Sequence, residues 1–354
     1  MSAMQSSSTP AGIPVSISPN RRIWLRFRQS RRGYWSLVIF LALFAFSLVA
    51  ELVSNDKPLI ARYNGQIMLP MLHDYSDKSF GGDFDSPADY LDPFIQNQFR
   101  KDGNWAVYPL NRYRYDTLNY FAKEPNPAPP TSDNWLGTDD RGRDVFARLL
   151  YGFRVSILFG LALTAIGVLL GVATGALQGY FAGRTDLYFQ RFLEIWGAMP
   201  ELYLLIIFSS IFEPGLGMLL ILLSLFGWMG LSDYVRADFL RNRNLEYIQA
   251  ARALGLSSGQ IIWRHVLPNS MTTVVTFLPF RMSAAILALT SLDFLGLGVP
   301  PSTPSLGELL AQGKNNLDAW WIALSTFITL TVMLLLLTNI GDALRNALDV
   351  RRKA

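Results

Sequence analysis

The side chain best suited to bind a charged group is an arginine inside an apolar stretch. Arg281 lies near Pro279, in a run of mostly apolar residues towards the C-terminal end of the chain. A guanidinium stays charged and pairs with carboxylates or phosphates through paired hydrogen bonds. An unpaired charge inside a bilayer costs several kcal/mol, so we expect Arg281 to face a water-filled path or a carboxylate. In a path it would favour anionic groups; snorkelling and pairing within an assembly are the alternatives.

Residue types that carry out catalysis or bind metals are scarce or poorly spaced. The chain has no cysteine, and its two histidines, His73 and His265, lack the spacing of metal ligands. No Gly-x-x-x-x-Gly-Lys-Ser/Thr sequence is present, so we expect the chain itself not to bind ATP. There is also no Gly-x-Ser-x-Gly nucleophile motif. The sequence therefore predicts no catalytic residue, no metal site and no cofactor in this chain.

The composition indicates a membrane protein. Hydrophobic residues make up 51% of the 354 residues and charged residues only 16%, whereas soluble domains carry about 25% charged residues. The apolar residues occur in runs of about 20, the length of a helix that crosses the hydrocarbon core of a bilayer. The net charge of +4 is typical of basic cytoplasmic loops, and no basic groove with interleaved aromatic residues indicates nucleic-acid binding.

Six apolar stretches predict an all-α polytopic membrane protein with six transmembrane helices. The predicted spans are Tyr34–Val53, Val155–Gly179, Phe192–Phe212, Leu216–Gly230, Thr272–Leu292 and Trp320–Ile340. The fourth span is short and begins beside a Glu-Pro-Gly turn signal. The chain is thereby divided into a basic N-terminal segment (1–33), a first helix (34–53), a polar insert (54–150), a core with the other five helices (151–342) and a tail (343–354).

The basic residues of the short connections predict the orientation. Lys and Arg cluster in the N-terminal segment, after the second span, between the fourth and fifth spans, and in the tail. The connections on the other side are nearly free of them. By the positive-inside rule we expect both termini in the cytoplasm and the insert on the extracytoplasmic side. Aromatic residues of the insert, such as Tyr90 and Phe99, predict a small folded region, although no strand is assigned there.

Four glycines recur at intervals of four residues in the second predicted span. Gly167, Gly171, Gly175 and Gly179 therefore lie on one face of a helix. Without side chains, this face lets a neighbouring helix approach closely. The spacing indicates a helix-packing surface, and a helix that slides or rocks is the alternative.

Charged and apolar residues alternate with helical spacing just before the second span. The charged residues Asp139, Asp140, Arg141, Arg143 and Asp144 can pair locally. Val145, Phe146, Leu149 and Leu150 would form one apolar face. We predict an amphipathic helix on the outer membrane surface, with a solvated charged turn as the alternative.

The segment of about 234–269 predicts two short helices joined by a sharp bend. One face of the first helix would carry Tyr247, Ala250, Ala251 and Leu254. Gly255 suits the C-terminus of that helix. The second helix is expected from Ser257 to Val266, ending before Pro268. The small side chains would let this projection insert deeply into a groove of a partner.

This segment resembles the EAA loop of ABC importer permeases. The resemblance rests on Ala250, Ala251, Gly255, Leu267 and Pro268, at the family spacing. Two positions depart from the family motif, because Gln249 replaces its glutamate and His265 stands at a hydrophobic position. Glu246 is retained three residues earlier, and Gln249 can hydrogen-bond but cannot form a salt bridge.

Two further segments resemble permeases of the dipeptide and oligopeptide C-subunit family. They are the Leu-Gly-Thr-Asp-Asp-Arg-Gly-Arg-Asp run from Leu136 and the Phe-Leu-Gly-Leu-Gly-Val-Pro-Pro run from Phe294. The long insert and the basic N-terminal run most resemble the YejE-type inner-membrane permeases of microcin C and peptide uptake.

The resemblance implies the type I ABC importer permease fold in the bacterial inner membrane. It implies a second, homologous permease, an ABC ATPase whose two nucleotide-binding domains resemble one fused chain, and a periplasmic peptide-binding protein. ATP and Mg²⁺ would be bound by that ATPase. The coupling residues would be Glu246, Tyr247, Gln249, Ala250, Ala251, Gly255, Leu267 and Pro268.

Three other classes of protein are weighed against this one. An ion-driven secondary transporter or channel predicts inverted repeats with broken helices, and no convincing repeat is found. A membrane anchor or signalling scaffold gives no reason for the spacing of Ala250, Gly255 and Pro268. An intramembrane enzyme lacks a candidate nucleophile.

Overall fold

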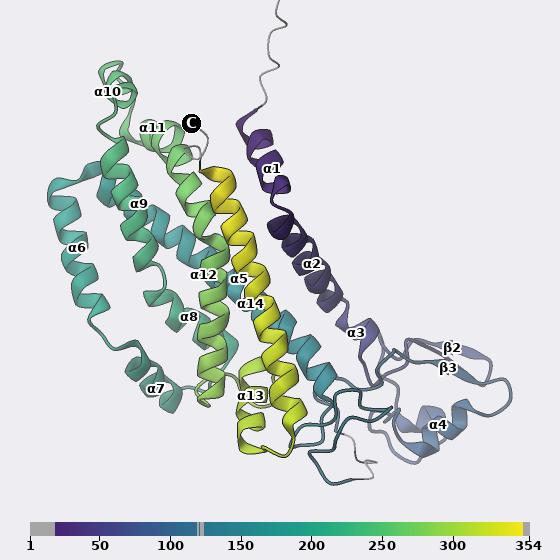
Figure 1. Ribbon diagram of the computed structural model, residues 1–354. Coiled ribbons are helices and arrows are strands. Elements are labelled where there is room, and N and C mark those ends of the chain that lie inside the picture. Colours follow the sequence, from purple (N-terminus) through teal and green to yellow (C-terminus); the bar gives the residue numbers. More distant parts are fainter. Residues whose placement is uncertain (1–17, 119, 121–123, 350–354) are drawn as a thin grey trace, which may run out of the picture.

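The computed structural model describes residues 18–118, 120 and 124–349. Within this part of the chain, long helices run side by side as a bundle, and the insert lies beyond one end of it (Figure 1). Five helical segments are long and apolar enough to cross a membrane, and a bent pair of helices provides a sixth. The prediction of a six-span helical membrane protein is confirmed. The outermost parts of the N-terminal segment and of the tail, 1–17 and 350–354, lie outside the described residues.

The described helices follow one another closely along the chain. Those before and within the first half of the bundle are α1 (Pro19–Gln29), α2 (Arg31–Leu48), α3 (Ala50–Val53), α5 (Val145–Phe181), α6 (Gly183–Gly197), α7 (Glu201–Ile211) and α8 (Leu216–Phe226). The later helices are α9 (Met229–Asn242), α10 (Glu246–Ala253), α11 (Ser258–Ile261), α12 (Leu267–Phe294), α13 (Leu306–Asn315) and α14 (Trp320–Leu348). Helix α5 packs between α9 and α12, and α14 packs against α2 and α12.

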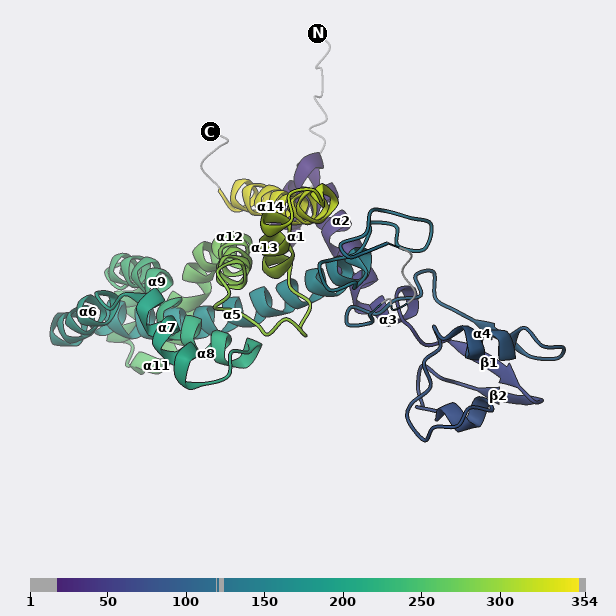
Figure 2. The same cartoon turned by 90° about the horizontal axis from the view of Figure 1, so that it is seen from below.

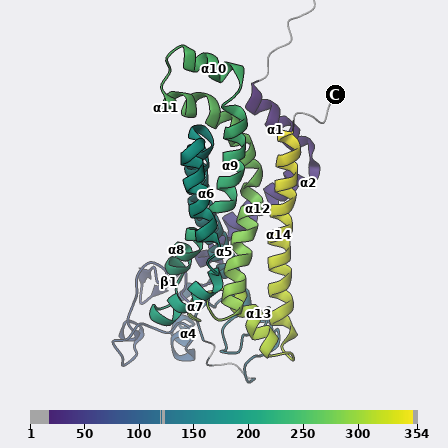
Figure 3. The ribbon, with the colours of Figure 1, turned by 90° about the vertical axis from the view of Figure 1, so that its left-hand side faces the viewer.

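The ends of the bundle differ in what they carry. Helices α10 and α11 project at the end where α1 begins and α14 ends (Figures 1 and 3). Helix α13 and the insert lie at the opposite end, and the view from below shows the insert displaced to one side of the bundle (Figure 2). The spatial arrangement therefore agrees with the predicted separation of the insert from the two termini.

Helix α5 is longer than the predicted second span. It runs unbroken through 37 residues, from Val145 to Phe181. The carboxylate of Asp144 accepts a hydrogen bond from the backbone N–H of Ala147 at 2.7 Å and so caps its first turn. The prediction of a separate amphipathic helix on the membrane surface is wrong, because these residues form the first turns of the span itself.

The third and fourth predicted spans have different boundaries in the structure. Helices α6 and α7 are bent by 64° at the break between them, where Pro200 lacks the N–H that a continuous helix would need. The fourth span is not short, because α8 and α9 together form a segment of 27 residues from Leu216 to Asn242. Arg236, expected in a loop, lies within α9 and pairs with Asp186 of α6 at 2.6 Å.

The second helix of the bent segment does not stop before Pro268. After α11 the chain forms one π-helical turn, η2 (Ile262–Val266), and continues directly into α12. Pro268 is the second residue of α12, at the place where the hydrogen-bond pattern changes from π-helical to α-helical. The fifth span therefore continues into this projecting segment without an intervening loop.

The insert contains a small sheet with its own apolar core. Strands β1 (Ile60–Tyr63), β2 (Gln66–Met68) and β3 (Trp105–Val107) pair antiparallel in the order β2-β1-β3. A short helix, α4 (Pro93–Phe99), and a 3₁₀ turn, η1 (Asp77–Phe80), complete it. Its core consists of Ala61, Phe80, Tyr90, Ile95 and Phe99. The predicted folded region is present, with strands too short to stand out in the sequence.

Candidate functional site

The projecting segment is built from α10, a glycine turn and α11. Gly255 has a φ of +82°, a conformation that residues with a side chain rarely adopt, and it ends α10 sharply. Ser257 and Gln260 form a reciprocal capping box that starts α11. Ile248 is fully buried and Ala251 is nearly so, and both pack onto a core that includes Phe239 of α9. The segment is therefore held in a defined position on the bundle.

The predicted coupling residues lie on two different sides of this segment. Glu246, Tyr247, Gln249, Ala250 and Gly255 are exposed, as a docking surface requires. Ala251 instead packs inward. Leu267 is half-buried at the start of α12, and Pro268 is exposed beside it. The amide of Gln249 donates to the carbonyl oxygen of Asn244 at 3.1 Å, so this side chain holds the entry to α10.

Two large apolar side chains are also exposed here. Leu254, directly after α10, is 81% exposed, and Trp263, in η2 after α11, is 71% exposed. Both belong to the stretch from α10 to η2, and α10 and α11 project at one end of the bundle (Figure 3). Exposed apolar side chains of this size, grouped on one projection, mark a surface for a protein partner. Trp263 was not among the residues expected at this surface, although a tryptophan beside charged Arg264 and His265 was a signal in the sequence.

The glycine face of α5 packs directly on α9. A Cβ atom added at Gly175 would lie 2.5 Å from the carbonyl oxygen of Ser232, and one at Gly179 would lie 2.5 Å from Cβ of Phe239. Gly171 is in similarly tight contact with Leu231. This geometry agrees with the helix-packing interpretation of the four glycines.

Gly167 has a different neighbour, the guanidinium of Arg281. A Cβ atom at Gly167 would lie 2.7 Å from Nη2 of Arg281. The same Nη2 donates a hydrogen bond to the carbonyl oxygen of Gly227, between α8 and α9. The absence of a side chain at Gly167 therefore makes room for the arginine inside the bundle.

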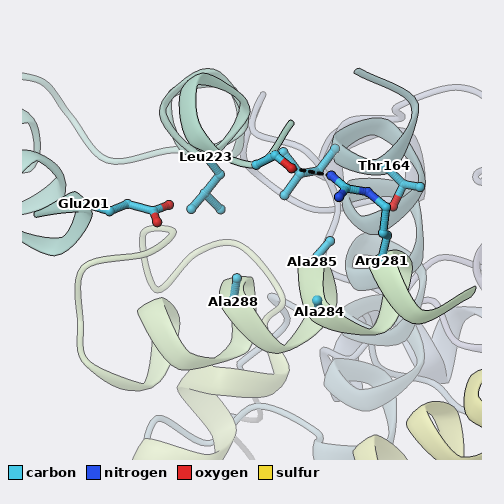
Figure 4. Close-up of a pocket in the computed structure, with 9 residues that line it drawn as sticks. Thr164, Glu201, Leu223, Arg281, Ala284, Ala285 and Ala288 are labelled. Atoms are coloured by element: carbon cyan, nitrogen blue, oxygen red, sulfur yellow. Dashed lines mark hydrogen bonds between the residues drawn. The ribbon is translucent and has the colours of Figure 1, made fainter. Parts of the chain in front are cut away.

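Arg281 lines a cavity of about 190 Å³ between α5, α7, α8 and α12. Glu201, the first residue of α7, lines the same cavity, and Figure 4 shows the two charged side chains at opposite ends of it. No ion pair links Arg281 to a carboxylate among the described residues. Arg281 was expected from the sequence but Glu201 was not, because the break at Pro200 that places this carboxylate beside the cavity was not predicted.

A second group of charges lies at the end of the bundle that carries the insert. Arg143 pairs with Asp139 at 2.6 Å and with Glu308 of α13 at 3.2 Å. The side chain of Arg148 is fully buried and pairs with Glu308, while its Nε lies 3.7 Å from Asp139. Burial alone would lower the pKa of Arg143, but the carboxylates of Asp139 and Glu308 outweigh it and raise this pKa above its usual range.

This charged cluster also anchors the insert. Asp144 accepts hydrogen bonds from Asn111 and from Asn134, each at 2.8 Å. Tyr151 of α5 donates to the carbonyl oxygen of Ser54 at 2.9 Å. Asp139 and Arg143 do pair locally as predicted, but the partner that completes the cluster, Glu308, is far away in the sequence.

The comparisons with known proteins agree on one family. The family described as "Binding-protein-dependent transport system inner membrane component" matches residues 157–354, more than half of the chain. The inner membrane ABC transporter permease protein YejE of Escherichia coli (strain K12) is 51% identical over 334 residues, which cover 94% of this chain and 98% of that protein. The peptidoglycan transport system permease protein YejE of Agrobacterium fabrum is 47% identical and covers 98% of this chain and 99% of that protein.

A more distant relative extends the comparison. The oligopeptide transport system permease protein OppC of Bacillus subtilis is 32% identical over 241 residues, which cover 68% of this chain and 78% of that protein. The resemblance inferred from the three sequence motifs is confirmed. The chain belongs to the binding-protein-dependent inner membrane components, is a multi-pass permease subunit of an ABC importer, and is of the YejE type.

Proposed function

We propose that this chain forms half of the translocation path of an ABC importer for peptides. The relatives named for peptide, oligopeptide and peptidoglycan transport support a peptide-containing substrate. A homologous second permease would supply the other half of the path. A periplasmic peptide-binding protein would deliver substrate at the end of the bundle that carries the insert.

The observation that carries this proposal is the projecting segment formed by α10 and α11. It presents exposed apolar side chains, Leu254 and Trp263, on a firmly seated support. A separate ABC ATPase, with its two nucleotide-binding domains joined in one chain, would bind this segment and hold the ATP and Mg²⁺. Closure of those domains would move the segment and, through η2, the helix α12.

The proposed orientation follows from the basic residues. Both termini and the projecting segment would lie in the cytoplasm, and the insert would lie in the periplasm. Support comes from Arg21, Arg22, Arg28, Arg31 and Arg32, which are all exposed at the end of the bundle where the projecting segment lies. The ATPase would then meet the projecting segment on the side where ATP is present.

Co-purification with the ATPase tests the coupling proposal. Gly255→Trp should prevent the ATPase from binding, because it adds a large side chain to the exposed turn and strains a residue at φ +82°. Gly103→Trp is the matched control, since Gly103 of the insert has a φ of +84° and equally open surroundings. Retention of the ATPase and of peptide uptake by the Gly255→Trp variant would contradict the proposal.

Uptake assays identify the substrate. A strain lacking only this gene, and the same strain carrying the gene, should be compared for uptake of labelled peptides and for sensitivity to a microcin C-like peptide conjugate. We expect the gene to restore uptake of at least one class of peptide. Normal uptake of all of them in the deletion strain would remove the peptide proposal.

A further inference from the structure

The cavity beside Arg281 contains polar groups that the described part of the protein leaves without partners. Nε of Arg281 and the hydroxyl of Thr164 are buried and have no hydrogen-bond partner among the described residues. Both belong to side chains that line the cavity, from α12 and α5 respectively. Buried polar groups are nearly always hydrogen-bonded, so the wall of the cavity around Arg281 and Thr164 is polar and incompletely paired among the described residues.

The two charges of the cavity are separate from each other. Glu201 has no hydrogen-bond or ion-pair partner among the described residues, and Arg281 donates only to a backbone carbonyl. Figure 4 shows their charged ends on opposite sides of the cavity. Charged residues inside a membrane bundle are rare and mark paths or sites for polar substrates. A ligand with one negative and one positive group would compensate both charges together.

The wall between the two charges is apolar and lined by small residues. Ala284, Ala285 and Ala288 of α12 form one side, and Leu223 of α8 lies opposite (Figure 4). The volume of about 190 Å³ is somewhat larger than the cavity of about 150 Å³ that accommodates benzene in another protein. The cavity is therefore small, and a peptide that enters it must have short side chains.

We propose that this cavity is a transient binding site for short zwitterionic peptides, with the carboxylate at Arg281 and the ammonium group at Glu201. The inference rests on the proposed peptide-import function and adds the class of substrate. Peptides blocked at either end lose one of the two charge contacts and bind more weakly.

A single-cysteine reporter tests this site. The chain contains no cysteine, so Ala288→Cys places one reactive thiol in the cavity of the assembled transporter, and Leu161→Cys, on the exposed face of α5, is the control. Ala-Ala should protect the thiol of Ala288→Cys from a maleimide. N-acetyl-Ala-Ala and Ala-Ala amide should each need at least tenfold higher concentrations. The thiol of Leu161→Cys should not be protected by any of them.

Charge variants assign the two contacts. In the Ala288→Cys background, Arg281→Gln should remove the difference between Ala-Ala and its amide, and Glu201→Gln should remove the difference between Ala-Ala and its N-acetyl form. Glu213→Gln, which changes a carboxylate outside the cavity, should change neither difference. Arg281→Lys keeps the positive charge and should retain part of the preference for Ala-Ala over its amide. This variant still tests the carboxylate contact if Arg281→Gln does not assemble.

Equal protection by all three peptides, or no protection by any of them, would overturn the proposed site. ATP-dependent uptake and co-purification of the ATPase are measured on the same Ala288→Cys protein. If these are intact while protection is absent, only the cavity proposal fails. If wild-type protein shows no ATP-dependent peptide uptake, the proposed function fails as well.

Discussion

The charged cluster near the insert and the projecting segment differ in where their side chains find partners. At the end near the insert, the charges of Arg143, Arg148, Asp139 and Glu308 are buried and paired with one another. At the projecting end, the apolar side chains of Leu254 and Trp263 are exposed. Buried ions and exposed large apolar groups are each costly when left alone.

The charged cluster is complete within the chain, whereas the projecting segment leaves large side chains exposed for a partner. The charged cluster is compensated within the chain and joins α5, α13 and the insert into one unit. The exposed side chains of Leu254 and Trp263 belong instead to the surface that we propose binds the ATPase. We therefore expect substitutions at the charged end to act on folding, and substitutions at the projecting end to act on assembly.

The largest expected effect is loss of Arg148. Arg148→Met should destabilise the protein by about 3–5 kcal/mol, because Glu308 and Asp139 then keep buried charges without full compensation. Thermal unfolding of the purified protein in detergent measures the change. Arg141→Ala is the matched control, since Arg141 is half-exposed and only 3.9 Å from Asp140, and it should cost about 0–1 kcal/mol.

A double variant sharpens this prediction. Arg148→Met combined with Glu308→Gln removes one charge of each sign and should recover part of the stability lost by Arg148→Met alone. Additive losses would mean that the two side chains are not coupled. Arg148 and Glu308 would then contribute to stability independently of each other.

The next effect is expected at Trp263. Trp263→Ala should leave the unfolding temperature nearly unchanged, because substitutions at exposed positions usually fall within about 0.5 kcal/mol. It should weaken binding of the ATPase by about 2 kcal/mol, or roughly 30-fold in Kd, as for an aromatic residue at the centre of an interface. Binding to the detergent-purified permease measures this. Trp320→Ala, a 60% exposed tryptophan on α14, should not change the affinity.

The smallest effect is expected at the cap of α11. Ser257→Ala removes the hydroxyl that accepts from the N–H of Gln260 at 3.4 Å, and should cost about 1 kcal/mol of local helix stability. Faster hydrogen exchange should be confined to the backbone amides of α11 and η2. Faster exchange at the charged end as well would show that the two ends are not independent.

The sequence was sufficient for much of the fold. Runs of apolar residues predicted all six spans, and the Gly167–Gly179 spacing predicted a tight helix contact that the structure places between α5 and α9. Gly255 correctly marked the end of α10. These features are local, because helical periodicity, glycine spacing and capping depend only on residues within a few positions of one another.

The remaining features depend on contacts between distant residues. Pairing of Arg148 with Glu308 joins positions 160 residues apart, and only the packing of α13 against the start of α5 brings them together. The approach of Glu201 to the Arg281 cavity depends on the bend between α6 and α7. A single sequence gives no measure of such distances.

The absence of a loop before α12 has a mechanical consequence. Residues Leu267–Phe294 form one helix of 28 residues, a rod of about 42 Å at 1.5 Å per residue. It begins next to the exposed Trp263 and carries Arg281 near its midpoint. The π-helical turn η2 precedes this rod and Pro279 lies within it, so a displacement of the projecting segment would be passed along α12 to the cavity beside Arg281, with bending expected at these two places.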